Sequence, residues 1–221
     1  MSNFSVFVNF KTYPQGTGEN AVKLAQVCQT VSQEKNLPVI PIVQAADLHL
    51  VKEAVKIPVW VEHLDPQPAG QSTGWTVLET VLAKGGDGTL LNHSEHPLPP
   101  GTIRQILSRI RGEKAQGFQT MVCAKTLGQL ERLVKLKPDF LAYEIAELIG
   151  GKVSITDFNP QAIKHAVEIG GEIPLIVGAG IHQAEDLRKA KELGAKGVLV
   201  SSAVVLAEDQ EKKLTELLKL I

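Results

Sequence analysis

Hydrophobic residues gather along the chain in eight short runs, and longer segments with a helical spacing separate these runs. The runs are rich in β-branched residues and are apolar at nearly every position, which is typical of strands that are covered on both faces. They span residues 5–10, 37–43, 57–63, 87–93, 118–124, 139–144, 173–179 and 196–202. This pattern predicts a parallel sheet with helices packed against it.

The segments between the runs have the pattern of amphipathic helices, because apolar residues recur at spacings of three and four. Thr126 is followed three residues later by Gln129, which predicts the capped start of one helix. Asn159 precedes Pro160, and proline is favoured at a first helical position, so a second helix is expected to begin there. The apolar stripe of residues 211–221 predicts a final helix.

Two architectures are compatible with this alternation of strands and helices. A doubly wound open sheet usually has five or six strands and a glycine-rich G-x-G-x-x-G fingerprint after the first of them. Here the first run leads into Asn9-Phe-Lys11 without that fingerprint. Eight units without a fingerprint, and without a Pro, Gly or Ser linker, predict a closed (β/α)₈ barrel that occupies residues 1–221 as one domain.

Composition restricts the partners that we expect. The 23 Lys and Arg residues nearly balance the 24 Asp and Glu residues, and the charges form no block of one sign, so a nucleic-acid or membrane-surface partner is not expected. The two cysteines, Cys28 and Cys123, are too few for a disulfide framework, which favours a cytoplasmic protein. No apolar stretch is long enough to predict a transmembrane helix.

Three ionisable residues lie where runs end, at the edge of a barrel that carries the active site. Glu144 ends an apolar run, so partial desolvation is expected to raise its proton affinity toward that of a useful base. His93 ends another run and could donate to a carbonyl oxygen, while Lys11 supplies positive charge. Each residue alone could equally be a structural strand-end residue. Together they provide a base, an electrophile and a cation around one cavity.

The last two runs end in small residues just before a helix. These are residues 177–180, Val-Gly-Ala-Gly, and residues 200–203, Val-Ser-Ser-Ala. Backbone N–H groups at such ends can approach an anion without obstruction by side chains. Small residues also occur in turns with a purely structural role. The local sequence at these two ends is therefore compatible with either a phosphate site or a structural turn.

Four motifs at these strand ends resemble those of the triosephosphate isomerase family. They are Asn9-Phe-Lys11, Asn92-His93-Ser94-Glu95, Tyr143-Glu144 with the segment that leads to Gly150, and Gly178-Ala-Gly180. The resemblance covers essentially the whole chain in the same order, and the short length is similar to that of the archaeal branch. It implies a TIM (β/α)₈ barrel that isomerises a small phosphorylated triose without a cofactor or a metal.

The resemblance also implies roles for individual residues. Glu144 would take a proton from the carbon beside the substrate carbonyl, and His93 would polarise that carbonyl. Lys11 would stabilise negative charge, with Asn9 helping to position it and Glu95 as a supporting residue. The substrate and its phosphate would contact Asn9, Lys11, Ile149, Gly150, Gly180, Ser201 and Ser202.

Residues 145–151 would form a lid that excludes water from the reaction. The family usually has proline directly after the base, whereas this chain has Ile145-Ala146, so we expect a looser first hinge. Residues 63–75 are similar to the loop that reaches a neighbouring subunit in this family. The resemblance therefore implies a homodimer or a homotetramer.

The sequence is compatible with two other functions besides the isomerase. A metal-dependent barrel hydrolase would use His93, Glu95, His96 and His63, but neighbouring strand residues point to opposite faces and the usual H-x-H pair on a first strand is missing. A phosphate-binding barrel without turnover would be compatible with the Ile145-Ala146 hinge. The intact set of Lys11, His93 and Glu144 favours the enzyme.

Overall fold

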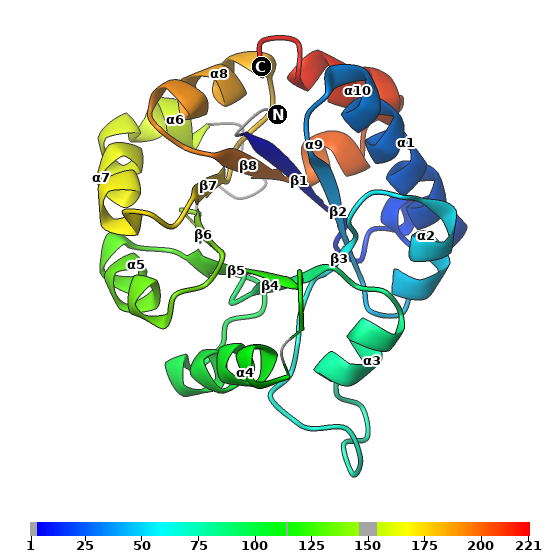
Figure 1. Cartoon of the computed structure of the whole chain (residues 1–221). Coiled ribbons are helices and arrows are strands. Elements are labelled where there is room, and N and C mark those ends of the chain that lie inside the picture. Colours follow the sequence, from blue (N-terminus) through cyan, green and yellow to red (C-terminus); the bar gives the residue numbers. More distant parts are fainter. Residues whose placement is uncertain (1–3, 114, 146–153) are drawn as a thin grey trace.

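Eight parallel strands form a closed barrel in the order of the sequence in the computed structural model, which describes residues 4–113, 115–145 and 154–221 (Figure 1). Its closing contact is the pairing of the first strand with the last, Val6 opposite Val198 and Val8 opposite Val200. The strands are β1 (Ser5–Asn9), β2 (Val39–Val43), β3 (Trp60–Val61), β4 (Gly88–Leu91), β5 (Gln119–Ala124), β6 (Phe140–Tyr143), β7 (Leu175–Gly178) and β8 (Gly197–Val200).

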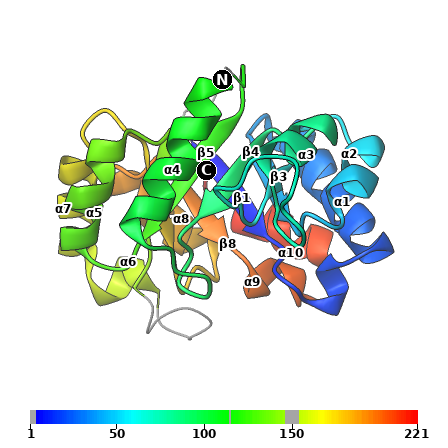
Figure 2. The same ribbon diagram turned by 90° about the horizontal axis from the view of Figure 1, so that it is seen from below.

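Helices surround the barrel and follow the strands along the chain (Figures 1 and 2). They are α1 (Glu19–Lys35), α2 (Leu48–Ala54), α3 (Leu78–Ala83), α4 (Pro100–Gly112), α5 (Leu127–Leu133), α6 (Ile155–Phe158), α7 (Pro160–Gly170), α8 (Ala184–Glu192), α9 (Ser202–Val205) and α10 (Gln210–Leu217), with 3₁₀ turns η1 (Pro14–Gly16) and η2 (Val134–Leu136). The predicted (β/α)₈ barrel is confirmed, whereas its description as one domain over 1–221 stays a prediction.

The eight strands lie at the predicted positions, but each is shorter than its apolar run. The largest difference is in residues 57–63, where only Trp60 and Val61 form the strand. Pro58 has no N–H to donate to a neighbouring strand, so the ladder cannot include it. The final helix was predicted to reach residue 221, but α10 ends at Leu217.

Both predicted helix starts are confirmed by their capping bonds. The Thr126 side chain accepts a hydrogen bond from the backbone N–H of Gln129, and the Asn159 side chain accepts one from Ala162. These bonds satisfy N–H groups that have no partner within the first turn of a helix. The two helices are α5 and α7, which pack beside each other on the outside of the barrel (Figure 1).

The barrel interior is filled by large side chains rather than by a channel. Phe7, Trp60 and Phe140 contact one another there, with ring centroids 5.0 to 5.9 Å apart. Strand alternation sends the next residue along each strand outward, where a second apolar layer packs against the helices. This packed interior gives the strand ends, and the residues that follow them, fixed positions.

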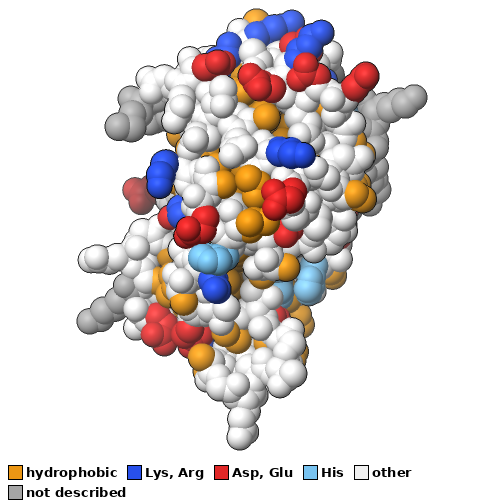
Figure 3. Space-filling view, turned by 90° about the vertical axis from the view of Figure 1, so that its right-hand side faces the viewer, with side chains coloured by type: hydrophobic (Ala, Val, Ile, Leu, Met, Phe, Trp, Pro, Cys, Tyr) orange, Lys and Arg blue, Asp and Glu red, His pale blue; other side chains and the backbone are white. Residues whose placement is uncertain are grey.

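Charged side chains of both signs are interspersed on the side of the molecule that carries α1 and α2 (Figure 3). The chain between β3 and α3 projects beyond the ring of helices (Figure 1). Within the described ranges, none of the helices is both long and apolar enough to cross a membrane.

The interior packing around Trp60 predicts a large effect of one added methyl group. A Cβ at Gly88 would lie 2.4 to 2.6 Å from three atoms of the Trp60 indole ring. Because the ring is fully buried, Gly88→Ala should lower the free energy of unfolding by about 1–3 kcal/mol, which chemical denaturation would measure. Gly101→Ala in α4 is the control, since no described atom outside its chain neighbours and the backbone of its own helix lies within 4 Å of the added Cβ, and an equal loss in both variants would contradict the argument.

Candidate active site

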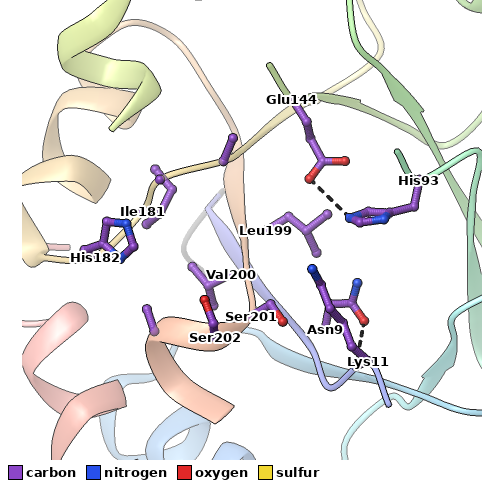
Figure 4. Close-up of a pocket in the computed structure, with 13 residues that line it drawn as sticks. Asn9, Lys11, His93, Glu144, Ile181, His182, Leu199, Val200, Ser201 and Ser202 are labelled. Atoms are coloured by element: carbon purple, nitrogen blue, oxygen red, sulfur yellow. Dashed lines mark hydrogen bonds and ion pairs between the residues drawn. The ribbon is translucent and has the colours of Figure 1, made fainter. Parts of the chain in front are cut away.

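A cavity of about 440 Å³, including its solvent-filled opening, lies where strands from both ends of the chain terminate (Figure 4). Its lining comes from the last residues of β1 and β8 and from the segments that follow β1, β4, β6, β7 and β8. The lining residues are Asn9, Lys11, His93, Glu144, Ala179, Gly180, Ile181, His182, Leu199, Val200, Ser201, Ser202 and Ala203. The cavity therefore contains the predicted base, electrophile and cation together.

Strand alternation explains why several of these side chains enter the cavity. Ala142 belongs to the barrel interior and Tyr143 to the outer layer, so Glu144 is inward again. Leu199 is likewise interior and Val200 belongs to the outer layer, so Ser201 points inward. These positions follow directly from the period of two along a strand.

His93 enters the cavity although simple alternation would send it outward. Leu90 is interior and Leu91 is outer, so Asn92 would be the inward residue and His93 the outward one. Asn92 adopts a left-handed conformation with φ 59°, which asparagine tolerates better than most residues and which resets the alternation. The Asn92 side chain donates to the Cys123 carbonyl at 2.7 Å and accepts from Leu98 N–H at 2.8 Å, which stabilises this turn.

Glu144 is buried, with 3% of its surface exposed, and it points toward His93 (Figure 4). Its Oε1 lies 3.7 Å from His93 Nε2, and its Oε2 has no hydrogen-bond partner among the described residues. Burial raises the pKa of the Cys123 thiol, and the charge and hydrogen bonding of Glu144 raise it further, so this thiol stays protonated beside the carboxylate. The carboxylate is thus held between the barrel interior and His93, with Oε1 as the oxygen that faces the histidine.

The hydrogen bonds of His93 determine where its ring carries a proton. The backbone N–H of Glu95 donates to His93 Nδ1 at 3.2 Å, so Nδ1 must be the unprotonated nitrogen. A neutral His93 ring then carries its proton on Nε2, which is the atom that faces Glu144. His93 can therefore donate a hydrogen bond into the cavity without being positively charged.

Lys11 is held at both its backbone and its side chain. Its backbone has φ 50°, and its N–H donates to Asn9 Oδ1 at 3.1 Å. Its Nζ forms an ion pair with Glu95 Oε1 at 2.6 Å. Asn9 and Lys11 lie across the cavity from Glu144 (Figure 4). A fixed positive charge therefore lies opposite the buried carboxylate.

The ends of β7 and β8 leave polar groups available to an anion. Ala179 and Gly180 both have positive φ, at 78° and 67°, so the backbone turns sharply at the cavity wall. Ser201 Oγ is buried and has no hydrogen-bond partner among the described residues. Ser202 follows it at the start of α9. Ile149 and Gly150, the remaining predicted binding residues, and the lid segment after Ile145 lie outside the described residues.

Comparison with known proteins decides the family. The sequence model of the family described as triosephosphate isomerase matches residues 4–220. The triosephosphate isomerase of Methanothermus fervidus is 38% identical over 217 residues, which cover 96% of each chain. That of Methanosarcina acetivorans is 34% identical and that of Methanocaldococcus jannaschii 33% identical, with at least 98% of each chain covered. The chain belongs to the triosephosphate isomerase family.

The metal-dependent alternative is not supported by the positions of its four residues. His63 stacks on His96 with ring centroids 4.1 Å apart, and its Nε2 contacts Asp65 Oδ1 at 3.0 Å. His93 instead directs its Nε2 toward Glu144. Across the described part of the chain, His, Cys, Asp and Glu side chains form no group of three or more that could hold a metal ion.

Sequence reasoning missed three contacts of the predicted site residues. Cys123 touches the Glu144 carboxylate, Gly178 packs beneath it, and Glu62 lies close to Lys11. The alternation of inward and outward side chains along a strand was the signal that could have indicated these three residues. Each of them follows an outward residue and occupies an inward position near the end of its strand. Gly178 was predicted only as part of the small-residue motif near the phosphate site, and no role was predicted for Cys123.

Gly178 provides the space that Glu144 occupies. A Cβ at residue 178 would lie 2.6 Å from Glu144 Oε1 and 2.8 Å from its Cγ. Gly178→Ala should therefore displace the carboxylate and lower kcat in a triosephosphate isomerase assay by about 10- to 100-fold, since misplacement by about 1 Å can cost 10²-fold. A variant with the kcat of the parent would show that the carboxylate position does not depend on this glycine, and Gly101→Ala is the matched control.

Proposed function

We propose that Glu144, His93 and Lys11 carry out the isomerase reaction of this family, the interconversion of dihydroxyacetone phosphate and D-glyceraldehyde 3-phosphate. The observation that supports this most directly is the approach of Glu144 Oε1 to His93 Nε2 at 3.7 Å across a cavity that Lys11 also lines. A base, a hydrogen-bond donor and a cation then face one small ligand.

In the proposed mechanism Glu144 removes the proton from the carbon beside the substrate carbonyl. The electron pair of that C–H bond forms the double bond of an enediolate, and the former carbonyl oxygen takes the negative charge. Glu144 then returns the proton to the neighbouring carbon, which completes the isomerisation. Its Oε1 faces His93 across the cavity, so a substrate carbon held between the two side chains lies within reach of the carboxylate.

His93 and Lys11 stabilise the charge that Glu144 creates. The Nε2–H of His93 donates to the developing enediolate oxygen and moves protons between the two substrate oxygens. The Lys11 ammonium adds a fixed positive charge, which its ion pair with Glu95 and the contact of its backbone with Asn9 hold in place. Asn9 and Glu95 therefore support the reaction by positioning Lys11.

The substrate phosphate is proposed to lie against Gly180, Ser201 and Ser202. Ser201 Oγ–H is a buried donor without a partner among the described residues, and an anion would satisfy it. The proposed contacts with Ile149 and Gly150 come from the resemblance alone. Closure of residues 145–151 over this anion would exclude water from the enediolate.

Replacement of the base tests the assignment. Glu144→Gln keeps the size of the side chain but removes its basicity, so kcat should fall by roughly 10²- to 10⁴-fold. A coupled assay of dihydroxyacetone phosphate conversion measures this, and titration with 2-phosphoglycolate should show that the variant still binds a phosphorylated ligand. A kcat equal to that of the parent would remove Glu144 from the mechanism, and a parent that binds without turnover would favour the phosphate-binding barrel.

We propose further that the chain assembles as a homodimer or a homotetramer through residues 63–75. The base of this projecting loop is closed by two hydrogen bonds, from Asp65 N–H to the Thr76 carbonyl and from Thr76 N–H to Asp65 Oδ2, at 2.9 and 2.8 Å. Trp75, with 51% of its surface exposed, lies beside this base. A large exposed indole on a well-anchored loop is typical of an interface.

Removal of this indole should weaken the assembly. Trp75→Ser is expected to shift the mass measured by light scattering after size exclusion toward that of the monomer of 23.9 kDa. Phe158→Ser is the matched control, because Phe158 is also an exposed aromatic residue, at 61%, but it lies on α6. A parent that already has the monomer mass would contradict the proposal.

The cellular setting completes the proposal. Both cysteines are free and buried, which suits a reducing cytoplasm, and we assign the reaction to glycolysis and gluconeogenesis in that compartment.

A further inference from the structure

A second cavity, the α4–α5 groove, lies on the outside of the barrel between α4 and α5, which are neighbours there (Figures 1 and 2). Its volume is about 990 Å³, including the solvent at its opening. Its lining residues fall between Asn92 and Leu136 in the sequence and belong to α4, α5 and the segments beside them. None of them lines the catalytic cavity. Asn92 faces the groove and His93 faces the catalytic cavity, so one turn separates the two sites.

The floor of the groove is apolar. Its main side chains are Leu98, Ile103, Leu133 and Leu136. Ile103 and Leu133 belong to the outer apolar layer of the barrel, and Leu98 and Leu136 are only partly buried against that layer. The floor therefore continues the hydrophobic core to the surface. A ligand that covered it would remove apolar area from water, which favours binding.

Four cations surround this floor, and no acidic residue of the described chain lines the groove. The cations are Arg104, Lys125, Arg132 and Lys135. Within the described ranges none of the four forms an ion pair. Arg109, further along α4 and outside the groove, is by contrast paired with Glu79. The rim of the groove thus carries positive charge that no described carboxylate neutralises at close range.

Hydrogen bonds hold the walls of the groove in place. The Lys125 backbone N–H donates to Gln129 Oε1 at 2.8 Å, and Lys125 Nζ donates to the Ser94 carbonyl at 3.4 Å. On the opposite side, Arg111 of α4 donates to the Leu136 carbonyl at 3.0 Å and so connects α4 to the turn after α5. A ligand would enter a groove that already has its shape, which lowers the cost of ordering on binding.

The charge of the rim discriminates between two kinds of occupant. A second copy of this chain, related by a twofold axis, would place the basic rim opposite itself, because such an interface uses the same patch on both subunits. Like charges that face each other oppose association. An anion with an apolar body instead matches both features of the groove, since its body covers the floor and its charge pairs with the rim.

We propose that the α4–α5 groove is a binding site for a small organic anion, separate from the catalytic cavity. The apolar body of this ligand lies on the floor around Leu98 and Leu136, and its carboxylate, phosphate or sulfonate group lies among the four cations of the rim. Both parts of the ligand are required. Water and salt screen exposed cations, so a small inorganic anion binds them weakly, and a neutral apolar molecule leaves the charge of the rim unpaired.

The probe for this site is 8-anilinonaphthalene-1-sulfonate, an apolar ring system with one anionic group whose fluorescence rises when it leaves water. Titration of the parent should show a single saturable site per chain. N-phenyl-1-naphthylamine has the same rings without the sulfonate and should bind at least about tenfold more weakly, because the charge-assisted contacts are lost. Equal affinities of the two probes, or the absence of saturable binding, would overturn the proposal.

Variants then locate the bound probe. Arg132→Gln combined with Lys135→Gln removes two cations of the rim, and Leu136→Ser removes part of the floor. Each change should raise the Kd of the sulfonate probe by about three- to tenfold. Lys23→Gln on α1 and Leu50→Ser on α2 are the matched controls, since both positions are exposed and lie outside the groove, and they should keep the Kd of the parent. Groove variants that also kept this Kd would refute the assignment.

Two more results would contradict the proposal. Excess 2-phosphoglycolate should leave the probe bound, whereas displacement would place the probe in the catalytic cavity. The double variant at Arg132 and Lys135 should keep the mass of the parent in light scattering, whereas a changed mass would show that a second copy covers the groove. None of these measurements requires turnover, so failure of this proposal is distinguishable from failure of the proposed function.

Discussion

Closure of the barrel between β1 and β8 is the constraint on which the site depends. Backbone pairing of Val6 with Val198 and of Val8 with Val200 joins the two ends of the chain. Because all eight strands are parallel, their carboxyl ends meet at one face, and groups far apart in sequence become neighbours. Lys11 and Ser201 line one cavity for this reason. The packed interior around Trp60 prevents the ring of strands from collapsing or shifting register.

A period of two along each strand made much of the site predictable from sequence. Once the apolar runs are taken as strands, the end of each run marks the mouth of the barrel: Glu144 is the last residue of its run and Lys11 directly follows its own. The same rule also indicates Glu62, which is the inward residue after β3.

Other features of the site depend on backbone conformations that sequence does not specify by itself. The left-handed turn at Asn92 moves His93 from the outward to the inward position, and its stability comes from a bond to the Cys123 carbonyl on β5. Such a contact exists only after two strands have paired. The contact of Gly178 with the Glu144 carboxylate likewise crosses from β7 to β6. Strand lengths were overestimated because ladder bonding, not hydrophobicity, decides where a strand ends.

Three glutamates near one lysine and one histidine illustrate how environment assigns roles to the same functional group. Glu95 is largely exposed and forms an ion pair with Lys11, so solvent and a counterion both stabilise its charge. Glu144 is buried and its Oε1 faces His93 Nε2 across the cavity, where the proposed mechanism has it take a proton from the substrate and return it. Glu62 is buried beside a backbone turn and two other carboxylates, which favours its neutral form. Burial of carboxyl oxygens without partners costs folding free energy, so Glu62 and Glu144 destabilise the fold at the mouth of the barrel, where the proposed reaction takes place.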